Sequence, residues 1–355
     1  MGRYELPDYS QVKDDLQPMP SGNPADVYGA GFVGAYYDGE GYEQAREAMS
    51  EAGLPFAFGA AASQYGLTGA ANPNGIYLLH KEIERAGVNV NTIAYASQPV
   101  GNCVSRGTQN ALLHTLCAAV NHGTGSIPPE MVAASASSNP ISSECLYWWK
   151  WSGSRPGGDG WYAGACLKAA KEKGGMVVRA DYRSIGGPDL RVETRATTHA
   201  YASESIPEGV RKIIHQHPLE AYAECQTIEE VADAIASGHA VQTDGGQGWA
   251  STVDEHGFAQ RRGSWSHSMC ATGIVRTDEA KKRYNTTGLI LIQNSWANFN
   301  HNDQATVMGT NGIKMPKGSF FARWEDCKNR SWFAVSSVKG WENRKLPNWN
   351  LGDLV

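Results

Sequence analysis

The sequence predicts an α+β fold in which a helical lobe is followed by a strand-rich lobe. Of the 355 residues, 41% are hydrophobic and 19% are charged, which is typical of a globular chain long enough for one large domain or two smaller ones. Between Val104 and Ala119 apolar residues recur at spacings of three, four and seven, which predicts a helix that ends near Asn121–Gly123. Later in the chain, short apolar runs are typical of strands, at His239–Gln242, Ser268–Val275, Leu289–Gln293 and Ser331–Val335.

Residues 1–94 are predicted to form an N-terminal arm and a glycine-rich extension. Few apolar residues occur in residues 1–24, and the prolines there indicate an extended arm (Pro7, Pro18, Pro20 and Pro24). The stretch that follows is rich in glycine and alanine, with helices expected at Glu40–Ala52 and Ile76–Ala86, each stopped by a glycine. The letters from Gly29 to Gly34 match the dinucleotide-binding pattern. Because neither a preceding strand nor a following helix is clearly supplied, we interpret them as a loop.

Residues 95–340 are predicted to form the main domain, followed by a C-terminal tail at 341–355. The helical lobe covers about 95–200 and the strand-rich lobe about 201–340, with a cleft expected between them. Two further helices are expected. One is Ala163–Lys173, closed by two glycines; the other is Ile228–Ala236, which has a threonine at its N-cap and two glutamates in its first turn.

The charge balance and the hydropathy exclude several classes of function. A net charge of −5 and a pI near 6.1, without a dense run of lysine or arginine, argue against a nucleic-acid partner. The first ten residues lack the apolar core of a signal peptide, and no apolar run is long enough to cross a bilayer. We therefore expect no membrane insertion, and a location in the cytoplasm or in a virus-like or other large assembly. The seven cysteines include no CxxC pair, which favours free buried thiols over a disulfide framework.

Three residues far apart in the sequence supply the parts of a cysteine nucleophile with an oriented base. Cys103 stands where a helix is expected to begin, His267 follows much later in the strand-rich half, and Asn294 comes after it. The positive end of a helix and a nearby imidazolium both favour the thiolate, and a side-chain carbonyl oxygen can hold the imidazole in one orientation. Gln98 and the backbone N–H of Cys103 are the donors that we expect at the developing oxyanion.

These segments resemble those of the papain-like cysteine peptidases over about residues 95–335. The block from Gln98 to Cys103 is similar to the family's glutamine and nucleophile segment, and the run around His267 is similar to its histidine strand. Leu291–Trp296 resembles its asparagine motif. Pro140–Tyr147 and Pro156–Tyr162 resemble the part of the family that follows the active-site helix. The resemblance implies a papain-like two-lobed fold, with a helical left lobe and an antiparallel β-barrel-like right lobe.

The resemblance also implies an activity and further site residues. The expected activity is hydrolysis of peptide bonds in a peptide or protein substrate, without a cofactor or a metal. Trp296 would shield the hydrogen bond between His267 and Asn294 from water. Gly157 and Gly158 would line the cleft and pair with the substrate backbone.

The chain departs from the family pattern in places, and two other functions stay open. Cys103 lies five positions after Gln98 where the family has six, Val104 replaces the usual residue after the nucleophile, and Ala297 stands where a glycine is expected. One alternative is a papain-like fold that serves as a structural or attachment component of a larger assembly such as a virus particle. Its N-terminal arm would then contact protein partners. The other is an acyltransferase of the transglutaminase type, which uses the same residue types with an amine as acceptor.

Two other clusters are interpreted as structural. His215 and His217 have no evident third ligand, so we expect a surface loop there and no metal site. The aromatic cluster at Trp148, Trp149 and Trp151 is expected to form core and cleft wall, not a carbohydrate platform.

Overall fold

The computed structural model describes residues 73–93, 98–121, 127–151, 160–201, 205–296, 299–300 and 302–336. The helices in these ranges are α4 (His80–Arg85), α5 (Val90–Ile93), α6 (Cys103–Asn121), α7 (Pro129–Ala134), α8 (Ser143–Trp148), α9 (Ala163–Lys173), α10 (Arg195–Thr198), α11 (Glu208–Gln216), α12 (Ile228–Ala236) and α13 (Asp278–Tyr284), with short 3-10 helices at η1 (Trp149–Trp151), η2 (Arg183–Ile185) and η4 (Trp324–Cys327). The strands are β1 (Ile76–Leu78), β2 (Tyr222–Glu224), β3 (Val241–Trp249), β4 (Arg261–Val275), β5 (Leu289–Gln293), β6 (Ser319–Arg323) and β7 (Arg330–Val335). The N-terminal arm, the loop expected at Gly29–Gly34, the helix expected at Glu40–Ala52 and the tail at 341–355 lie outside the described residues.

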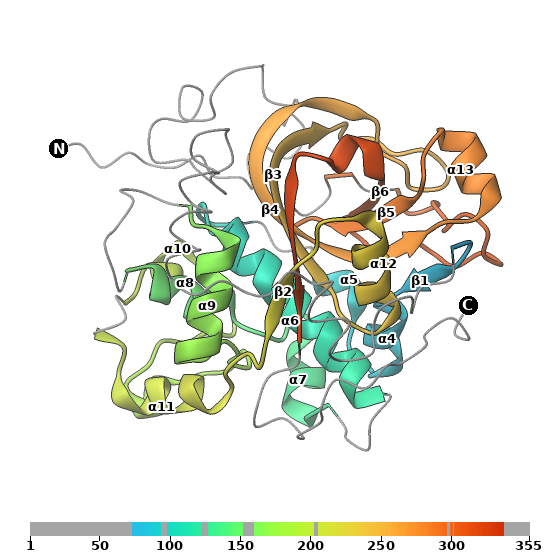
Figure 1. Ribbon diagram of the computed structural model, residues 1–355. Helices are drawn as coiled ribbons and strands as arrows, with labels where there is room; N and C mark the ends of the chain where they lie inside the picture. The colour runs from blue at the N-terminus through green and yellow to red at the C-terminus, as the bar shows by residue number, and fades with distance from the viewer. Residues whose placement is uncertain are drawn as a thin grey trace.

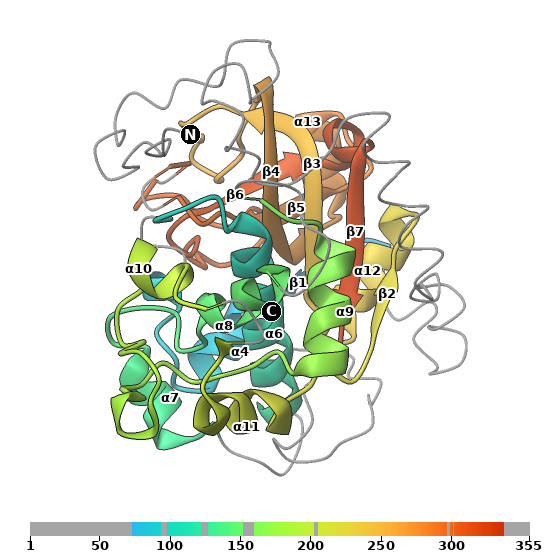
Figure 2. The same ribbon diagram turned by 90° about the vertical axis from the view of Figure 1, so that its left-hand side faces the viewer.

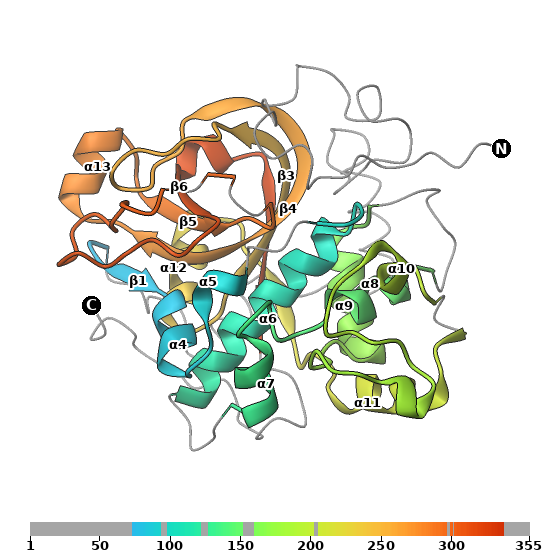
Figure 3. The same ribbon diagram turned by 180° about the vertical axis from the view of Figure 1, so that it is seen from behind.

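The α+β prediction is confirmed. Helices α6 to α11 gather in one part of the molecule, and the strands form a sheet beside them (Figure 1). Helix α6 runs through the middle, with the sheet on one side and α8 and α9 on the other (Figure 3). Nearly every residue from Cys103 to Ala118 is buried, because α6 packs on β4 and also contacts α4, α8 and α9. None of the described helices combines the length and apolarity needed to cross a membrane.

The strands form one antiparallel sheet in the order β2-β7-β3-β4-β5-β6, and β1 also pairs with β4. Strands β3 and β4 are the longest and run side by side (Figure 2). Val241, at the start of β3, pairs with Ala271 of β4, so the edge of β4 beyond that point is open to β1, which pairs at Gly273–Val275. On its other edge β4 pairs with β5, where Gln293 lies opposite Cys270. This register brings the end of β5 beside the middle of β4.

Three of the predicted helices are confirmed at their predicted bounds. The helix expected after Cys103 is α6, which ends at Asn121, and the other two are α9 and α12. The Thr227 hydroxyl accepts a hydrogen bond from the backbone N–H of Glu230 at 3.2 Å, so the predicted N-cap of α12 is also present. All four predicted strands lie within or overlap strands of the sheet, and Leu289–Gln293 coincides with β5.

The helix predicted at Ile76–Ala86 is partly wrong. Its first three residues form β1, because their backbone groups pair with β4, and only His80–Arg85 is helical. Residues 76–93 were expected in an extension outside the main domain. In the structure Ile83, Val90 and Ile93 belong to the same buried core as α6, so packing of the main core begins before residue 94.

The two clusters interpreted as structural have different outcomes. His215 is in the last turn of α11 and His217 follows it, so the surface loop predicted there is wrong. Val210 and Ile214, which are buried in this helix, are four residues apart, a spacing typical of a helix. The described residues contain no group of three or more ligands that could hold a metal ion. Trp148 and Trp149 are buried in the core, as predicted, and their indole N–H groups donate to the carbonyls of Thr197 and Gly174.

Gly107 allows α6 to approach β4 closely. A Cβ atom at this position would lie 2.7 Å from the Ser268 hydroxyl oxygen and 3.1 Å from the Met269 carbonyl oxygen. Alanine favours a helix over glycine by about 1 kcal/mol, but we expect this clash to outweigh the gain. Gly107→Ala should lower the free energy of unfolding in urea by about 1–3 kcal/mol. Gly107→Ala combined with Ser268→Ala should recover part of the loss, since it removes the nearest atom. An equally destabilised double variant would contradict this explanation.

Candidate active site

Cys103 is the first residue of α6, where the loop before it is held by backbone hydrogen bonds. The Asn102 carbonyl accepts the first helical bond from Arg106 N–H at 3.1 Å, and Asn102 N–H donates to the Val100 carbonyl at 2.8 Å. Gly160 N–H donates to the Gly101 carbonyl at 2.9 Å. The thiol therefore lies in the first turn of a 19-residue helix, at its positive end, as the sequence predicted.

His267 and Asn294 meet because they lie on neighbouring strands. His267 is on β4, and Asn294 directly follows β5, whose last residue pairs with Cys270 of β4. The His267 Nε2 lies 2.8 Å from Asn294 Oδ1. The backbone N–H of Ser295 also donates to this oxygen, at 2.7 Å. Since only an oxygen can accept from that N–H, the Asn294 carboxamide presents its oxygen to the imidazole, and His267 Nε2 is the protonated nitrogen.

Strand β4 also passes near the Cys103 thiol. The backbone of Ser268, the residue after His267, lowers the pKa of that thiol, so Ser268 lies close to the sulfur. With Nε2 protonated, the Nδ1 of His267 is the nitrogen with a free electron pair and can take a proton. The structure thus joins His267 and Asn294, which are far apart in the sequence, and the residue after His267 lies near Cys103.

Aromatic side chains cover the histidine–asparagine pair. The Trp296 ring stacks on the His267 ring with centroids 4.1 Å apart and an angle of 25°. Trp265, two residues before His267 on β4, meets the Trp296 ring edge-on at 4.6 Å, and Phe299 meets it at 5.5 Å. These rings cover the His267 imidazole on the side of Trp296, and the role of Trp296 in shielding the hydrogen bond from water stays a prediction.

Gln98 lies beside the asparagine segment. Its Nε2 donates to the Val100 carbonyl at 2.7 Å, and its Oε1 accepts from the Ser295 hydroxyl at 3.3 Å. An amide nitrogen carries two N–H groups, so the contact with Val100 leaves one for an oxyanion. Gly157 and Gly158, expected to line the cleft, lie outside the described residues, although Gly160 two positions later touches the nucleophile loop.

Burial favours the uncharged forms of the thiol and the imidazole. It raises the pKa of the Cys103 thiol well above its usual range, and the backbone of Ser268 lowers that pKa by a smaller amount. It lowers the pKa of His267 to about 3, against the hydrogen bond to Asn294. Both side chains are almost fully buried, at 0% and 1% exposure. Burial therefore favours a neutral thiol and a neutral imidazole in this structure.

A buried carboxylate, that of Asp244, is close enough to the Cys103 thiol to affect its pKa. Asp244 is on β3, directly opposite Ser268 in the register of the sheet, and its Oδ2 accepts from the Ala163 N–H at the start of α9 at 2.9 Å. Burial raises the pKa of Asp244 to about 6, while Ser268, Ala163 and Arg330 favour its charged form. Its negative charge in turn raises the pKa of Cys103.

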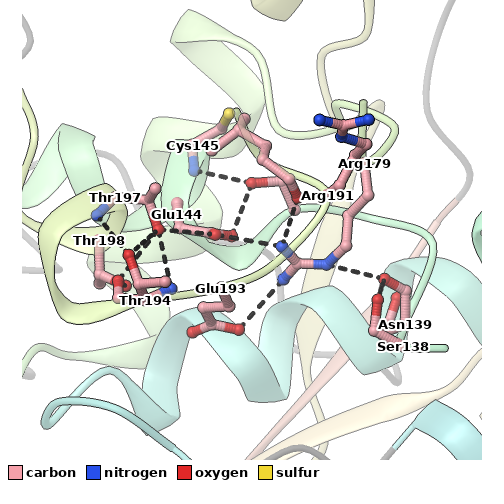
Figure 4. Close-up of polar contacts among 12 residues, drawn as sticks. Ser138, Asn139, Glu144, Cys145, Arg179, Arg191, Glu193, Thr194, Thr197 and Thr198 are labelled. Carbon is pink, nitrogen blue, oxygen red and sulfur yellow. Dashed lines mark hydrogen bonds and ion pairs between the residues drawn. The ribbon is translucent and has the colours of Figure 1, made fainter. Parts of the chain in front are cut away.

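A network of buried charges anchors the start of α6, and Figure 4 shows the part of it around Arg179, Glu144 and Glu193. Glu193 accepts from Asn102 Nδ2 at 2.7 Å and pairs with Arg106 Nη2 at 2.8 Å and with Arg179 Nη2 at 3.1 Å. Arg179 also pairs with Glu144 at 3.1 Å. Burial alone would raise the pKa of Glu193, but the two guanidinium groups outweigh it and hold that pKa below its usual value. Burial raises the pKa of Glu144, against the charge of Arg179.

Sequence reasoning missed Arg106, Glu193, Asp244 and Trp265. Arg106 had a usable signal: it is the one residue of α6 with a permanent charge, in a helix that the pattern already predicted to be buried. Such a charge needs a buried partner. The identity of the partner could not be read from the sequence, because Glu193 lies far along the chain in a segment without helix or strand.

Comparison with known proteins gives matches among solved structures. No family model and no curated protein matches the chain. The chain is similar to xylellain, a cysteine protease from Xylella fastidiosa, at 13% identity and a TM-score of 0.46, over 77% of this chain and 89% of that one. It is also similar to procathepsin L 3 of Tenebrio molitor, at 11% identity and a TM-score of 0.38, over 74% and 69% of the two chains. A third match is procathepsin B S9 of Trypanosoma congolense, at 14% and 0.40, over 72% and 75%.

Proposed function

We propose that this chain is a papain-like cysteine peptidase in which Cys103 is the nucleophile, His267 the base and Asn294 the residue that orients it. The observation that carries the proposal is the hydrogen bond from His267 Nε2 to Asn294 Oδ1, covered by Trp296. It lies on the strand whose next residue, Ser268, lowers the pKa of Cys103 through its backbone. A structural cysteine needs none of these partners. The arrangement supplies a proton acceptor with a fixed tautomer beside a thiol at a helix start.

The chemistry follows from these positions. His267 Nδ1 takes the thiol proton, and the Cys103 sulfur attacks the carbonyl carbon of a peptide bond, so that a carbon–sulfur bond forms. The backbone N–H of Cys103 and the second amide N–H of Gln98 stabilise the oxyanion. The imidazolium returns its proton to the leaving amine as the carbon–nitrogen bond breaks. A water molecule, activated by the same imidazole, then hydrolyses the thioester and regenerates the thiol.

Access to the thiol is part of the proposal. Cys103 and His267 are almost completely buried, so a substrate must first displace the residues that cover them. Exposure to water would also remove the penalty that burial places on the charged thiolate and imidazolium. We expect the reactive form to be the opened one.

Intact-mass labelling of the native protein tests the proposal. A papain-family epoxide inhibitor and iodoacetamide should each add one group at Cys103, and labelling by the epoxide should be lost in Cys103→Ala and His267→Ala. Iodoacetamide is the smaller reagent. Labelling by iodoacetamide but not by the epoxide would show that the thiol is reactive and that the larger reagent cannot reach it. Cys166→Ala is the matched control, because that thiol is also buried and near Asp244 but contacts Thr108 instead of the histidine strand.

Two outcomes would count against a peptidase. Labelling that spreads over several cysteines and does not depend on His267 would show that the thiol is not activated. Failure of both reagents with the folded protein would favour the alternative of a structural component of a larger assembly. If labelling succeeds, product analysis with and without an added amine separates hydrolysis from acyl transfer.

A further inference from the structure

Asn300 is buried beside Asn294, and it is not one of the residues expected to take part in catalysis. Its exposure is 0%, and its backbone has φ of +60°, in the left-handed region that asparagine and glycine tolerate best. Its backbone N–H donates to the Ser251 carbonyl at 3.0 Å, and its Nδ2 donates to the Ala250 carbonyl. These contacts fasten the segment after Asn294 to the residues that follow β3.

The remaining polar atom of Asn300 faces the expected site. Its Oδ1 accepts from Asn294 Nδ2 at 3.4 Å. The Nδ2 of Asn300 is already committed to a carbonyl, so its Oδ1 is the atom that Asn294 meets, and only an N–H of Asn294 can make that contact. The opposite end of the Asn294 carboxamide, its Oδ1, then faces His267 and the Ser295 N–H.

We propose that Asn300 is a positioning residue for Asn294: together with the Ser295 N–H on the other end of the carboxamide, it keeps the carboxamide oxygen on the imidazole and so keeps the proton of His267 on Nε2. A rotated carboxamide would offer an N–H to Nε2, which favours the tautomer with its proton on Nδ1. In that tautomer Nδ1 cannot accept the thiol proton. This role rests on the proposed function, because the tautomer matters to the reaction only if His267 is the base.

The sequence pattern agrees with such a role. Beyond Trp296 the chain has Ala297 where the papain-like family has a glycine, and the family's glycine–tryptophan pattern is largely missing. Asn300 supplies here both a left-handed backbone position and a side chain that reaches back to Asn294.

Asn300→Gly tests the proposal with little disturbance of the backbone. Glycine accepts the left-handed conformation and retains the N–H that donates to Ser251, so only the two side-chain contacts are lost. We expect the His267-dependent labelling rate of Cys103 to fall about ten-fold, the size of effect expected for one lost hydrogen bond. In the Asn294→Ala background the same change should have no further effect on that rate, because Asn300 acts through Asn294.

A second readout does not require activity. The ¹⁵N shifts of His267 should show the Nε2–H tautomer in the native protein and a mixture of tautomers in Asn300→Gly. If labelling of the native protein does not depend on His267, the proposed function fails. The role of Asn300 is then decided by the tautomer: a mixture in Asn300→Gly supports it, and an unchanged Nε2–H tautomer overturns it.

If native labelling depends on His267 but Asn300→Gly changes neither rate nor tautomer, the role of Asn300 is overturned and the proposed function stands. An equal fall in rate with and without Asn294 would also overturn it, since the effect would then be structural.

Discussion

Glu193→Gln is expected to lower the free energy of unfolding by about 3–5 kcal/mol, as breaking a buried ion pair generally does. The Glu193 carboxylate lies between the guanidinium groups of Arg106 and Arg179, and none of the three side chains is more than 6% exposed. A neutral amide removes the charge that pairs with Arg106 and Arg179. Arg179 retains its ion pair with Glu144, at 3.1 Å.

The same change should loosen the start of α6. Glu193 also accepts from Asn102, the residue before Cys103, and Arg106 donates to the Ser295 carbonyl at 3.5 Å, next to Asn294. The carboxylate therefore helps to hold the nucleophile loop and the asparagine segment together. We expect slower labelling of Cys103 in Glu193→Gln at a temperature where the variant is still folded.

Urea unfolding measures the loss of stability, with Glu208→Gln as the matched control. Glu208 pairs with Lys212 at 2.8 Å, but both side chains are more than two-thirds exposed, so solvent screens the pair and little change is expected. Similar unfolding midpoints for Glu193→Gln and Glu208→Gln would show that the buried network does not stabilise the fold.

The sequence was sufficient to predict a helix or a strand where the local pattern and the tertiary contacts favour the same structure. The apolar spacing after Cys103 predicted a buried helix, and α6 is buried by β4 on one side and helices on the other. Thr227 predicted the start of α12 because a cap is a local interaction between neighbours in the chain. Leu289–Gln293 is apolar at nearly every position, as expected of a strand covered on both faces, and all of β5 is buried.

Prediction failed where distant contacts decide the structure. Ile76–Leu78 is a short apolar run that could continue the helix after it, and pairing with β4, a strand from much later in the chain, makes it β1. The order of Cys103, His267 and Asn294 predicted a nucleophile with an oriented base, and the structure joins His267 and Asn294. The roles of the residues that hold them, such as Glu193 and Asn300, could not be predicted from the sequence. A glutamate or a loop asparagine has many ordinary roles, and no motif marks these two.

Acidification is expected to destabilise the protein steeply between about pH 6.5 and pH 4, because four of the histidines that the structure describes are buried in neutral form. Burial lowers the pKa of His80 and of His267 to about 3, and that of His114 and of His239 to about 4. The nearby His114 lowers the pKa of His80 further. In the unfolded chain a histidine has a pKa of about 6.5, so unfolding takes up protons below that pH, and stability falls as the pH falls.

Asp244 works in the opposite direction. Burial raises its pKa to about 6, whereas an unfolded aspartate has a pKa of about 3.9, so below pH 6 unfolding releases its proton. Glu144 and Glu193 are shifted in opposite directions and oppose each other. Near pH 5, four histidines that gain a proton and one aspartate that loses one leave a net uptake of about three protons. At about 1.4 kcal/mol per proton and pH unit, the free energy of unfolding should fall by about 4 kcal/mol per pH unit.

Urea unfolding at closely spaced pH values around pH 5 checks this slope, and two variants should move it in opposite directions. His239→Gln removes one proton-binding group and should make the slope shallower by about 1.4 kcal/mol per pH unit. Asp244→Asn removes the opposing group and should make the slope steeper by the same amount, because asparagine can still accept from Ala163 but cannot lose a proton. Identical slopes in the native protein and both variants would mean that other groups govern acid unfolding. Opposite changes would trace it to these buried side chains, and would imply that a pH low enough to charge His267 in the closed site also unfolds the protein around it.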